Sequence, residues 1–215
     1  MAASEDFTRA LAYFSQPNHL SSYEIKLGEG KVMFSAPHAV LQTRRGALKQ
    51  AERYTGMLCL LLHERLHLPC IYKTRHMKDD ANFDPVSEYR EALCQTVKKN
   101  GIAFVLDLHQ LSPERPMDVC LCTGRGKNLG SCPELPGIAQ DILSSHRFEK
   151  ITLDDPFDAS SPHTIASTVA QSCRVCALQI EINTRLLMET SLEQRFFDML
   201  EALGQIAHEL DLKYA

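Results

Sequence analysis

The chain has 215 residues, of which 44% are hydrophobic and 23% charged, and its formal net charge is -4. This length suits a single domain with a substantial core, so we expect residues 1–215 to form one domain. The negative net charge argues against nucleic acid as a main partner, because binding to phosphate backbones requires a concentrated basic surface.

The first residues of the chain do not resemble a signal peptide, since Glu5 and Asp6 stand where a positively charged start would be needed. No stretch approaches the eighteen consecutive apolar residues of a membrane span. The sequence therefore predicts a soluble, cytoplasmic protein.

Eight cysteines are too few in a chain of this length to form a disulfide scaffold, and we expect reduced thiols. Cys120 and Cys122 form a CxC, and Cys173 and Cys176 form a CxxC. A structural zinc on these four cysteines is a weak alternative, because no second CxxC is present.

Apolar periodicity predicts strands that alternate with helices along nearly the whole chain. The expected strands are 31–37, 69–74, 102–110, 117–123, 151–153 and 176–187, and the expected helices are 7–14, 46–67, 85–99, 136–145, 164–173 and 191–212. Ser191 and Gln194 form a plausible capping box for the last helix. This alternation predicts an α/β fold with three layers, in which helices cover both faces of a mostly parallel or mixed sheet.

The stretch 102–110, IAFVLDLHQ, is an apolar run of strand length that ends in polar residues. Such a run is typical of a strand that is buried on both faces. Side chains alternate along a strand, so Val105, Asp107 and His109 should share one face. Two polar groups then lie at the carboxyl end of a buried strand, where open α/β sheets bind their ligands.

The last expected strand carries apolar side chains on one face and Gln179, Glu181 and Asn183 on the other. An amphipathic strand at a solvated edge of the sheet would show the same pattern. Glutamate is depleted from strands, however, so Glu181 is also a candidate acid or base.

His38 ends one strand and His109 another, while Glu52 is expected on the buried face of the helix that follows His38. Two imidazoles and one carboxylate are the ligand set of a catalytic zinc site with an open position for water. Such a site lowers the pKa of the water, and a nearby carboxylate such as Glu181 can take the proton.

Four segments together resemble the successive motifs of N-formylglutamate amidohydrolases, which are zinc-dependent enzymes similar in fold to the metallocarboxypeptidases. The segments are SAPHA (35–39), KQAERYTG (49–56), DLHQLSPERPMDV (107–119) and ALQIEIN (177–183), and the resemblance spans roughly residues 31 to 190. It implies zinc on His38, Glu52 and His109, with Glu181 as general base and proton shuttle.

The resemblance also implies arginines that hold a substrate carboxylate and polarise the scissile carbonyl, since a guanidinium grips a carboxylate through two bonds. Arg75, Arg115 and Arg185 border expected strand ends and are the candidates, with Arg75 first. His163, in a loop, is a further candidate substrate contact.

The sequence departs from the carboxypeptidase pattern, because no glutamate lies three residues after His38. Glu52 must instead be supplied by the following helix, and Asp107 is its rival as third ligand. Asp107 can alternatively accept a hydrogen bond from a ligating imidazole.

The sequence thus predicts a zinc-dependent amidohydrolase that acts on a small N-acyl amino acid such as N-formylglutamate. A small carboxypeptidase-like peptidase acting on short peptides is the alternative within the same class. A metal-binding or ligand-binding module without turnover is the alternative from another class.

Overall fold

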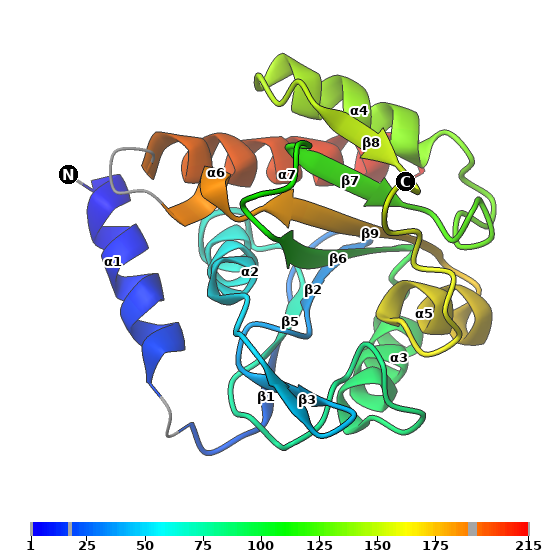
Figure 1. Cartoon of the computed structure of the whole chain (residues 1–215). Helices are drawn as coiled ribbons and strands as arrows, with labels where there is room; N and C mark the ends of the chain where they lie inside the picture. The colour runs from blue at the N-terminus through cyan, green and yellow to red at the C-terminus, as the bar shows by residue number, and fades with distance from the viewer. Residues whose placement is uncertain (1, 17–18, 189–192, 215) are drawn as a thin grey trace.

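A computed structural model describes residues 2–16, 19–188 and 193–214, and its centre is a seven-stranded sheet (Figure 1). The strand order is β1-β5-β2-β6-β9-β7-β8. The strands are β1 (Tyr23–Lys26), β2 (Val32–Ala36), β5 (Cys70–Lys73), β6 (Phe104–Leu111), β7 (Val119–Cys122), β8 (Ile151–Leu153) and β9 (Cys176–Asn183).

The sheet is mixed, which confirms the predicted α/β fold. Strands β5, β2, β6 and β9 are parallel neighbours. At one edge β1 is antiparallel to β5, and on the other side β7 is antiparallel to β9 while β8 runs parallel to β7. The parallel strands bring the ends of β2, β6 and β9 to the same edge of the sheet.

Helices cover both faces of this sheet, as Figure 1 shows. One apolar core includes side chains of α1, α2, α4 and α7, and the other includes those of α3 and α5. The helices are α1 (Ala2–Ser15), α2 (Arg53–Leu66), α3 (Glu88–Asn100), α4 (Leu135–Ser145), α5 (Ile165–Cys173), α6 (Arg185–Met188) and α7 (Glu193–Lys213). Among the described residues, none of these helices has the length and apolar character that crossing a membrane requires.

Two helix starts follow from side-chain caps. The Ser87 hydroxyl accepts a hydrogen bond from the backbone N–H of Arg90, and α3 begins at Glu88, three residues after the predicted start at residue 85. Thr164 caps α5 in the same way, at the predicted position. The capping box predicted for the last helix includes Ser191, which lies outside the described residues.

The predicted helix over 46–67 is wrong in its first part. Residues 42–49 form a hairpin of β3 (Gln42–Arg44) and β4 (Ala47–Lys49), turned by Arg45 and Gly46 with φ values of 51° and 79°. Two successive positive φ angles are the signature of a type I′ turn, and glycine adopts one of them without strain. Leu48, placed on the helical stripe by its spacing, is 63% exposed in the hairpin.

Strand β9 lies between β6 and β7, and all eight of its residues are buried. Its apolar side chains, Leu178, Ile180 and Ile182, belong to the core beneath α2 and α7. The polar side chains therefore point to the opposite face, which is also buried. This position excludes the solvated edge strand that the alternating pattern also allowed.

Candidate metal centre

Side chains from three separate elements meet at the carboxyl edge of the parallel strands. His38 follows β2 by two residues, His109 lies near the end of β6, and Glu52 immediately precedes α2. Each offers one ligand atom, and these atoms all lie within 4.8 Å of one another. The Nδ1 atoms of the two histidines are 3.2 Å apart, and they lie 2.9 Å and 3.3 Å from the two carboxylate oxygens of Glu52.

Glu52 reaches this position from the N-cap of α2, where the sequence pattern had placed it on the buried stripe of a helix. Its backbone N–H donates a hydrogen bond to the carbonyl of His38 at 2.8 Å. The two ends of the segment that contains the hairpin therefore lie next to each other. The Glu52 carboxylate accepts a second hydrogen bond from the backbone N–H of Gln110 at 3.0 Å. The backbone of Glu52 is therefore fixed to the end of β2, and its carboxylate is fixed to β6.

The outer nitrogen of each imidazole is bound to a buried aspartate. His38 Nε2 lies 2.9 Å from Asp80, and His109 Nε2 lies 2.9 Å from Asp107. A carboxylate accepts hydrogen bonds, so each Nε2 carries the proton and, in the neutral imidazole, each Nδ1 presents a lone pair. Asp107 thus accepts a hydrogen bond from the His109 imidazole, and it is Glu52 that joins the two histidines in the group that could hold a metal ion.

The net charge of the side chains at this site matches the charge of a divalent cation. Glu52, Asp80 and Asp107 are carboxylates at this site, and the Arg44 guanidinium is paired with one of them, Asp80, at 2.7 Å. With neutral imidazoles, two negative charges remain to be balanced away from bulk water, which is costly without a counter-charge.

The donor set also fits zinc in spacing. Nitrogen and oxygen ligands at about 2.0–2.1 Å in tetrahedral array lie about 3.3 Å from one another. The separations among His38, Glu52 and His109 are 2.9 to 3.3 Å. The separations among these three side chains therefore match those expected around a small cation.

The charges of this cluster shift its pKa values in opposite directions. Burial acts against ionisation of Glu52, but the two histidines outweigh it and lower the pKa of this carboxyl to about 2. Burial also disfavours the imidazolium of His38 and of His109, yet their carboxylate partners raise both pKa values. Asp80 is held well below its usual pKa, against its burial, by His38 and Arg44.

Glu181 lies beside this cluster, because its residue on β9 is paired with His109 on β6. It is 8% exposed, and burial raises the pKa of its carboxyl to about 7. Its Oε1 accepts a hydrogen bond from the Gln179 amide at 2.9 Å, and the Gln179 oxygen faces the Asn82 amide at 3.4 Å. A buried carboxyl that changes charge near neutral pH is suited to proton transfer.

Two of the four candidate substrate residues, Arg75 and Arg115, differ in their contacts. Arg75 follows β5 by two residues, and its guanidinium has no hydrogen-bond partner within the described part of the chain. Arg115 is exposed and lies 5.5 Å over the Phe157 ring.

Arg185 and His163 are engaged elsewhere in the structure. The Arg185 guanidinium forms a 2.5 Å ion pair with Asp118 and also donates to the Arg115 carbonyl. The His163 carbonyl accepts a hydrogen bond from buried Arg90, and its side chain lines a surface hollow between α3 and α5. Within the described ranges, neither residue forms a hydrogen bond or an ion pair with His38, Glu52 or His109.

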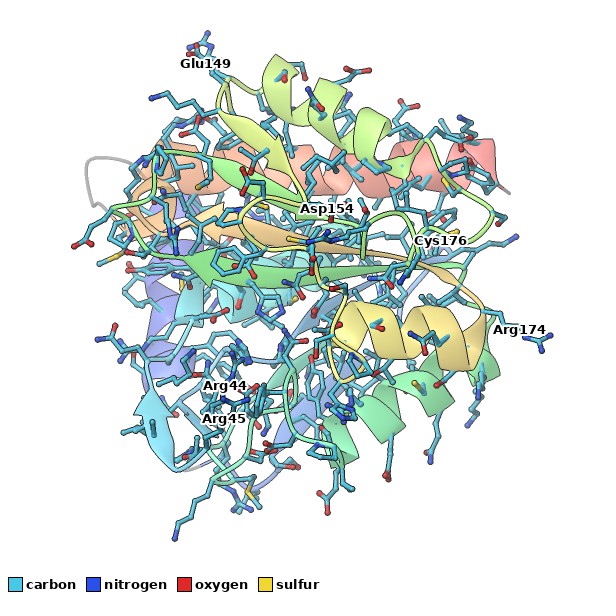
Figure 2. All side chains as sticks on the ribbon, turned by 45° about the vertical axis from the view of Figure 1, so that its right-hand side comes forward. Arg44, Arg45, Glu149, Asp154, Arg174 and Cys176 are labelled. Carbon is cyan, nitrogen blue, oxygen red and sulfur yellow. The ribbon has the colours of Figure 1, made fainter. Side chains whose placement is uncertain are left out.

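Sequence reasoning missed three residues of this site: Asp80, Arg44 and Gln179. Asp80 is in the polar loop 75–84, where nothing distinguishes it from Asp79, which pairs with Lys73 instead. Arg44 belongs to the hairpin that was predicted as a loop and helix, and Figure 2 labels it beside Arg45. Gln179 was expected on the polar face of its strand, but its hydrogen bond to Glu181 was not predicted. The spacing of two residues between them on one strand is the signal that could have indicated this contact.

The four cysteines considered as a zinc site do not come together as one. Cys120 and Cys122 are 3.7 Å apart on β7. Cys173 contacts the carbonyl of Cys94, and Cys176 contacts Ser131. Among the described residues, His38, Glu52 and His109 form the one group with the geometry to hold a metal ion.

Comparison with known proteins identifies solved structures of the same fold. N-formylglutamate amidohydrolase from Ralstonia eutropha JMP134 has 16% sequence identity and a TM-score of 0.63, with 91% of this chain and 100% of that chain covered. A bacteriophage poly-gamma-glutamate hydrolase has 15% identity and a TM-score of 0.59, covering 90% and 91%. Succinylglutamate desuccinylase from Vibrio parahaemolyticus has 14% identity and a TM-score of 0.54, covering 94% and 70%.

Sequence comparison adds no relative to these structures. No protein-family model matches the chain, and no curated protein matches it. The predicted resemblance to N-formylglutamate amidohydrolases is thus present in the three-dimensional structure: over nearly its whole length, this chain is similar in fold to an N-formylglutamate amidohydrolase.

Proposed function

We propose that this protein is a zinc-dependent amidohydrolase that cleaves the amide bond of a small N-acyl amino acid such as N-formylglutamate. One observation carries the proposal. The lone pairs of His38 and His109 converge with the Glu52 carboxylate, while Glu181, a buried carboxyl with a raised pKa, lies next to them. Three fixed ligands with a proton acceptor at their side are the parts that metal-assisted hydrolysis requires.

In this proposal His38, Glu52 and His109 hold the zinc ion. When bound, zinc supplies a Lewis acid and lowers the pKa of the attacking water. Asp80 and Asp107 hold each imidazole with its proton on Nε2, which keeps Nδ1 free for the metal.

Glu181 acts as the general base and proton shuttle. Gln179 occupies its Oε1, so Oε2 is the atom that accepts a proton from the attacking water and returns it to the leaving nitrogen. Burial raises its pKa to about 7, so that both the acceptance and the release of a proton are possible near neutrality.

The substrate carboxylate is bound by arginine. Arg75 is the first candidate, because its guanidinium has no partner within the described residues and it follows the strand next to β2. Arg115, Arg185 and His163 remain further candidates. Arg185 would have to give up contacts with Asp118 and the Arg115 carbonyl to serve.

The similar structures support the substrate class. The names of three of them refer to an N-formylglutamate amidohydrolase, a poly-gamma-glutamate hydrolase and a succinylglutamate desuccinylase. Each name describes hydrolysis of an acyl or peptide derivative of glutamate. We therefore propose an acidic amino-acid derivative as substrate, and, since all eight cysteines are free thiols, action in a reducing compartment such as the cytoplasm.

Metal analysis combined with a hydrolysis assay tests the proposal. Protein purified without chelator is expected to contain one zinc per chain and to release formate from N-formyl-L-glutamate. A chelator should abolish the release and zinc should restore it. Faster cleavage of short peptides would favour the carboxypeptidase-like alternative, and stoichiometric zinc without consumption of any of these substrates would favour a binding module.

A further inference from the structure

Two cysteines form part of the same buried face as the candidate site. Cys120 and Cys122 lie two apart on β7, so their side chains point to the same side of the sheet. Both are fully buried, and their sulfur atoms are 3.7 Å apart. In the antiparallel pairing of β7 with β9, Cys120 is opposite Glu181 and Cys122 is opposite Gln179.

The two thiols are not equivalent. The hydrogen bond with Cys122 lowers the pKa of Cys120 to about 6, whereas the pKa of Cys122 is raised. A thiolate beside a protonated thiol is the arrangement in which one sulfur attacks an oxidant and the other completes a disulfide.

The segment after β8 contacts the sulfur of Cys120. The carbonyls of Asp155 and Phe157 lie 3.3 Å and 3.5 Å from Cys120 Sγ. Asp154, labelled in Figure 2, fixes the start of this segment by accepting hydrogen bonds from the backbone N–H and hydroxyl of Thr123. Because both side chains are fully buried, a small oxidant must displace part of this cover to reach Cys120.

A disulfide between these residues would be easy to reduce. Alternate residues of an extended strand are about 6.6 Å apart at Cα, close to the upper limit of about 6.8 Å for disulfides. Closing the bond must also bring the sulfurs together from 3.7 Å to about 2.05 Å. A strained disulfide has a more oxidising potential, which suits a reversible bond rather than a permanent cross-link.

We propose that Cys120 and Cys122 are a redox-active dithiol in the wall of the candidate site, closed by a peroxide and reopened by a thiol reductant. The Cys120 thiolate attacks one peroxide oxygen, so that a sulfur–oxygen bond forms, the oxygen–oxygen bond breaks and water leaves. Cys122 then attacks the sulfenic sulfur, which forms the disulfide and releases the second water. Two thiols and one hydrogen peroxide thus give one disulfide and two waters.

Formation of the disulfide would change the positions of residues on β7 relative to the neighbouring strand β9. Closing it displaces Cys120 and Cys122 relative to Glu181 and Gln179, the pair that the proposed function uses for proton transfer. The expected result is slower hydrolysis in the oxidised protein. This second part rests on the proposed function, whereas the formation of the disulfide does not.

The chain offers a direct assay for the disulfide. The tryptic peptide 100–125 contains Cys120 and Cys122 and no other cysteine, because the arginine at 115 precedes a proline. The whole protein is treated with hydrogen peroxide, and the remaining thiols are blocked with iodoacetamide. After tryptic digestion, the mass of this peptide is measured by mass spectrometry before and after reduction with dithiothreitol. We expect it to lose two hydrogens and escape alkylation, and to accept two alkyl groups after reduction.

Three variants sharpen the assay. Cys122→Ser should stop at a sulfenic acid on Cys120 that dimedone labels, and Cys120→Ser should resist oxidation in this peptide. Cys173→Ser, which removes a thiol near Cys94 on the helices, should oxidise at 100–125 like the wild type.

Two results would overturn the proposal: a peptide that stays fully alkylated, or one that passes directly to sulfinic and sulfonic acids. A disulfide that forms while formate release continues at the unoxidised rate would refute its effect on the site. If the reduced protein hydrolyses nothing, the proposed function fails, and the mass of the peptide still decides whether the dithiol exists.

Discussion

The Nδ1 atoms of His38 and His109 face each other 3.2 Å apart, while the Nε2 atom of each ring is bound to an aspartate. Two lone pairs at this distance repel each other unless a proton or a cation lies between them. The side chains are nevertheless held together by strand ends, a helix cap and buried carboxylates. The fold therefore contains a position whose stability depends on a positive charge.

Removal of the metal should make stability depend strongly on pH. In metal-free protein the pKa values of His38 and His109 are raised, so protons supply the positive charge. The contribution of the two protonated histidines to the free energy of unfolding is complete below pH 6.5, which is about the pKa of histidine in the unfolded chain. It is lost as the pH rises through the higher pKa values of His38 and His109 in the folded protein. Thermal unfolding with a chelator should therefore show a lower melting temperature at pH 9 than at pH 6.

Zinc should reverse this dependence, because histidine binds metal in its neutral form. Adding zinc is expected to raise the melting temperature more at pH 8 than at pH 6. His38→Ala should lose the zinc response, and His208→Ala, on the exposed side of α7, should keep it. An equal response in the two variants would contradict the metal centre.

Asp80→Asn and Asp107→Asn should each weaken zinc binding about 10- to 100-fold, since each aspartate orients a ligating imidazole and increases its basicity. Competition with a fluorescent zinc chelator measures the affinity. Asp141→Asn, an exposed change on α4, serves as the matched control and should bind like the wild type. Wild-type affinity in both site variants would show that the outer carboxylates do not support the metal.

Glu181→Gln should reduce kcat about 10²- to 10⁴-fold, because it removes the proton acceptor but retains the size of the side chain. Zinc content should stay at the wild-type level. Glu149→Gln, an exposed substitution, should leave kcat unchanged. Loss of zinc together with activity would instead place Glu181 among the metal ligands.

The same substitution should stabilise the metal-free protein at high pH. The pKa of Glu181 is raised from 4.5 to about 7, so the buried carboxyl favours folding in its neutral form below about pH 4.5, and this advantage is lost as the pH rises through about 7. A shift of this size corresponds to about 3 kcal/mol. Urea unfolding with chelator should show Glu181→Gln more stable than wild type at pH 8.5, with a smaller difference at pH 5.

Gln179→Leu should shift the acid limb of kcat/KM to higher pH. The Gln179 amide donates to Glu181 Oε1 and so favours the carboxylate form; without this bond the pKa of Glu181 rises. A hydrogen bond to a charged group contributes about 1.5–3 kcal/mol, so kcat/KM at pH 7 should fall about tenfold or more. Recovery of the wild-type rate at higher pH distinguishes this effect from a general loss of structure, which would lower the rate at every pH.

The central strands and their polar residues could be predicted because a buried parallel strand is recognisable in the sequence as a continuous run of apolar residues. Strand β6 needs apolar side chains on both faces, so Asp107 and His109 stand out at its end. The same reasoning found Glu181 on β9. Strand 151–153 was also correct, and the helix predicted over 164–173 is α5 to within one residue, because both follow from local residue preferences.

The hairpin and the outer carboxylates could not be predicted, because they depend on contacts distant in sequence. Leu48 and Ala51 continue the spacing of α2, and nothing local shows that Arg45 and Gly46 turn the chain back. Asp80 is separated from His38 by the whole of α2 and β5. Whether the predicted arginines and His163 bind substrate, and whether the chain is one domain, stay predictions.

The hydrogen bond from the Glu52 backbone to the His38 carbonyl closes the intervening chain into a loop with a fixed base. His38 and Glu52 at that base are anchored by β2 and α2, and inside the loop Arg44 supports His38 through its ion pair with Asp80. Replacements at the exposed residues 45–50, beyond this ion pair, can therefore change the loop surface while His38 and Glu52 keep their positions. This exposed turn is the part of the hairpin in which the sequence can vary in length and composition without moving the cluster of His38, Glu52 and His109.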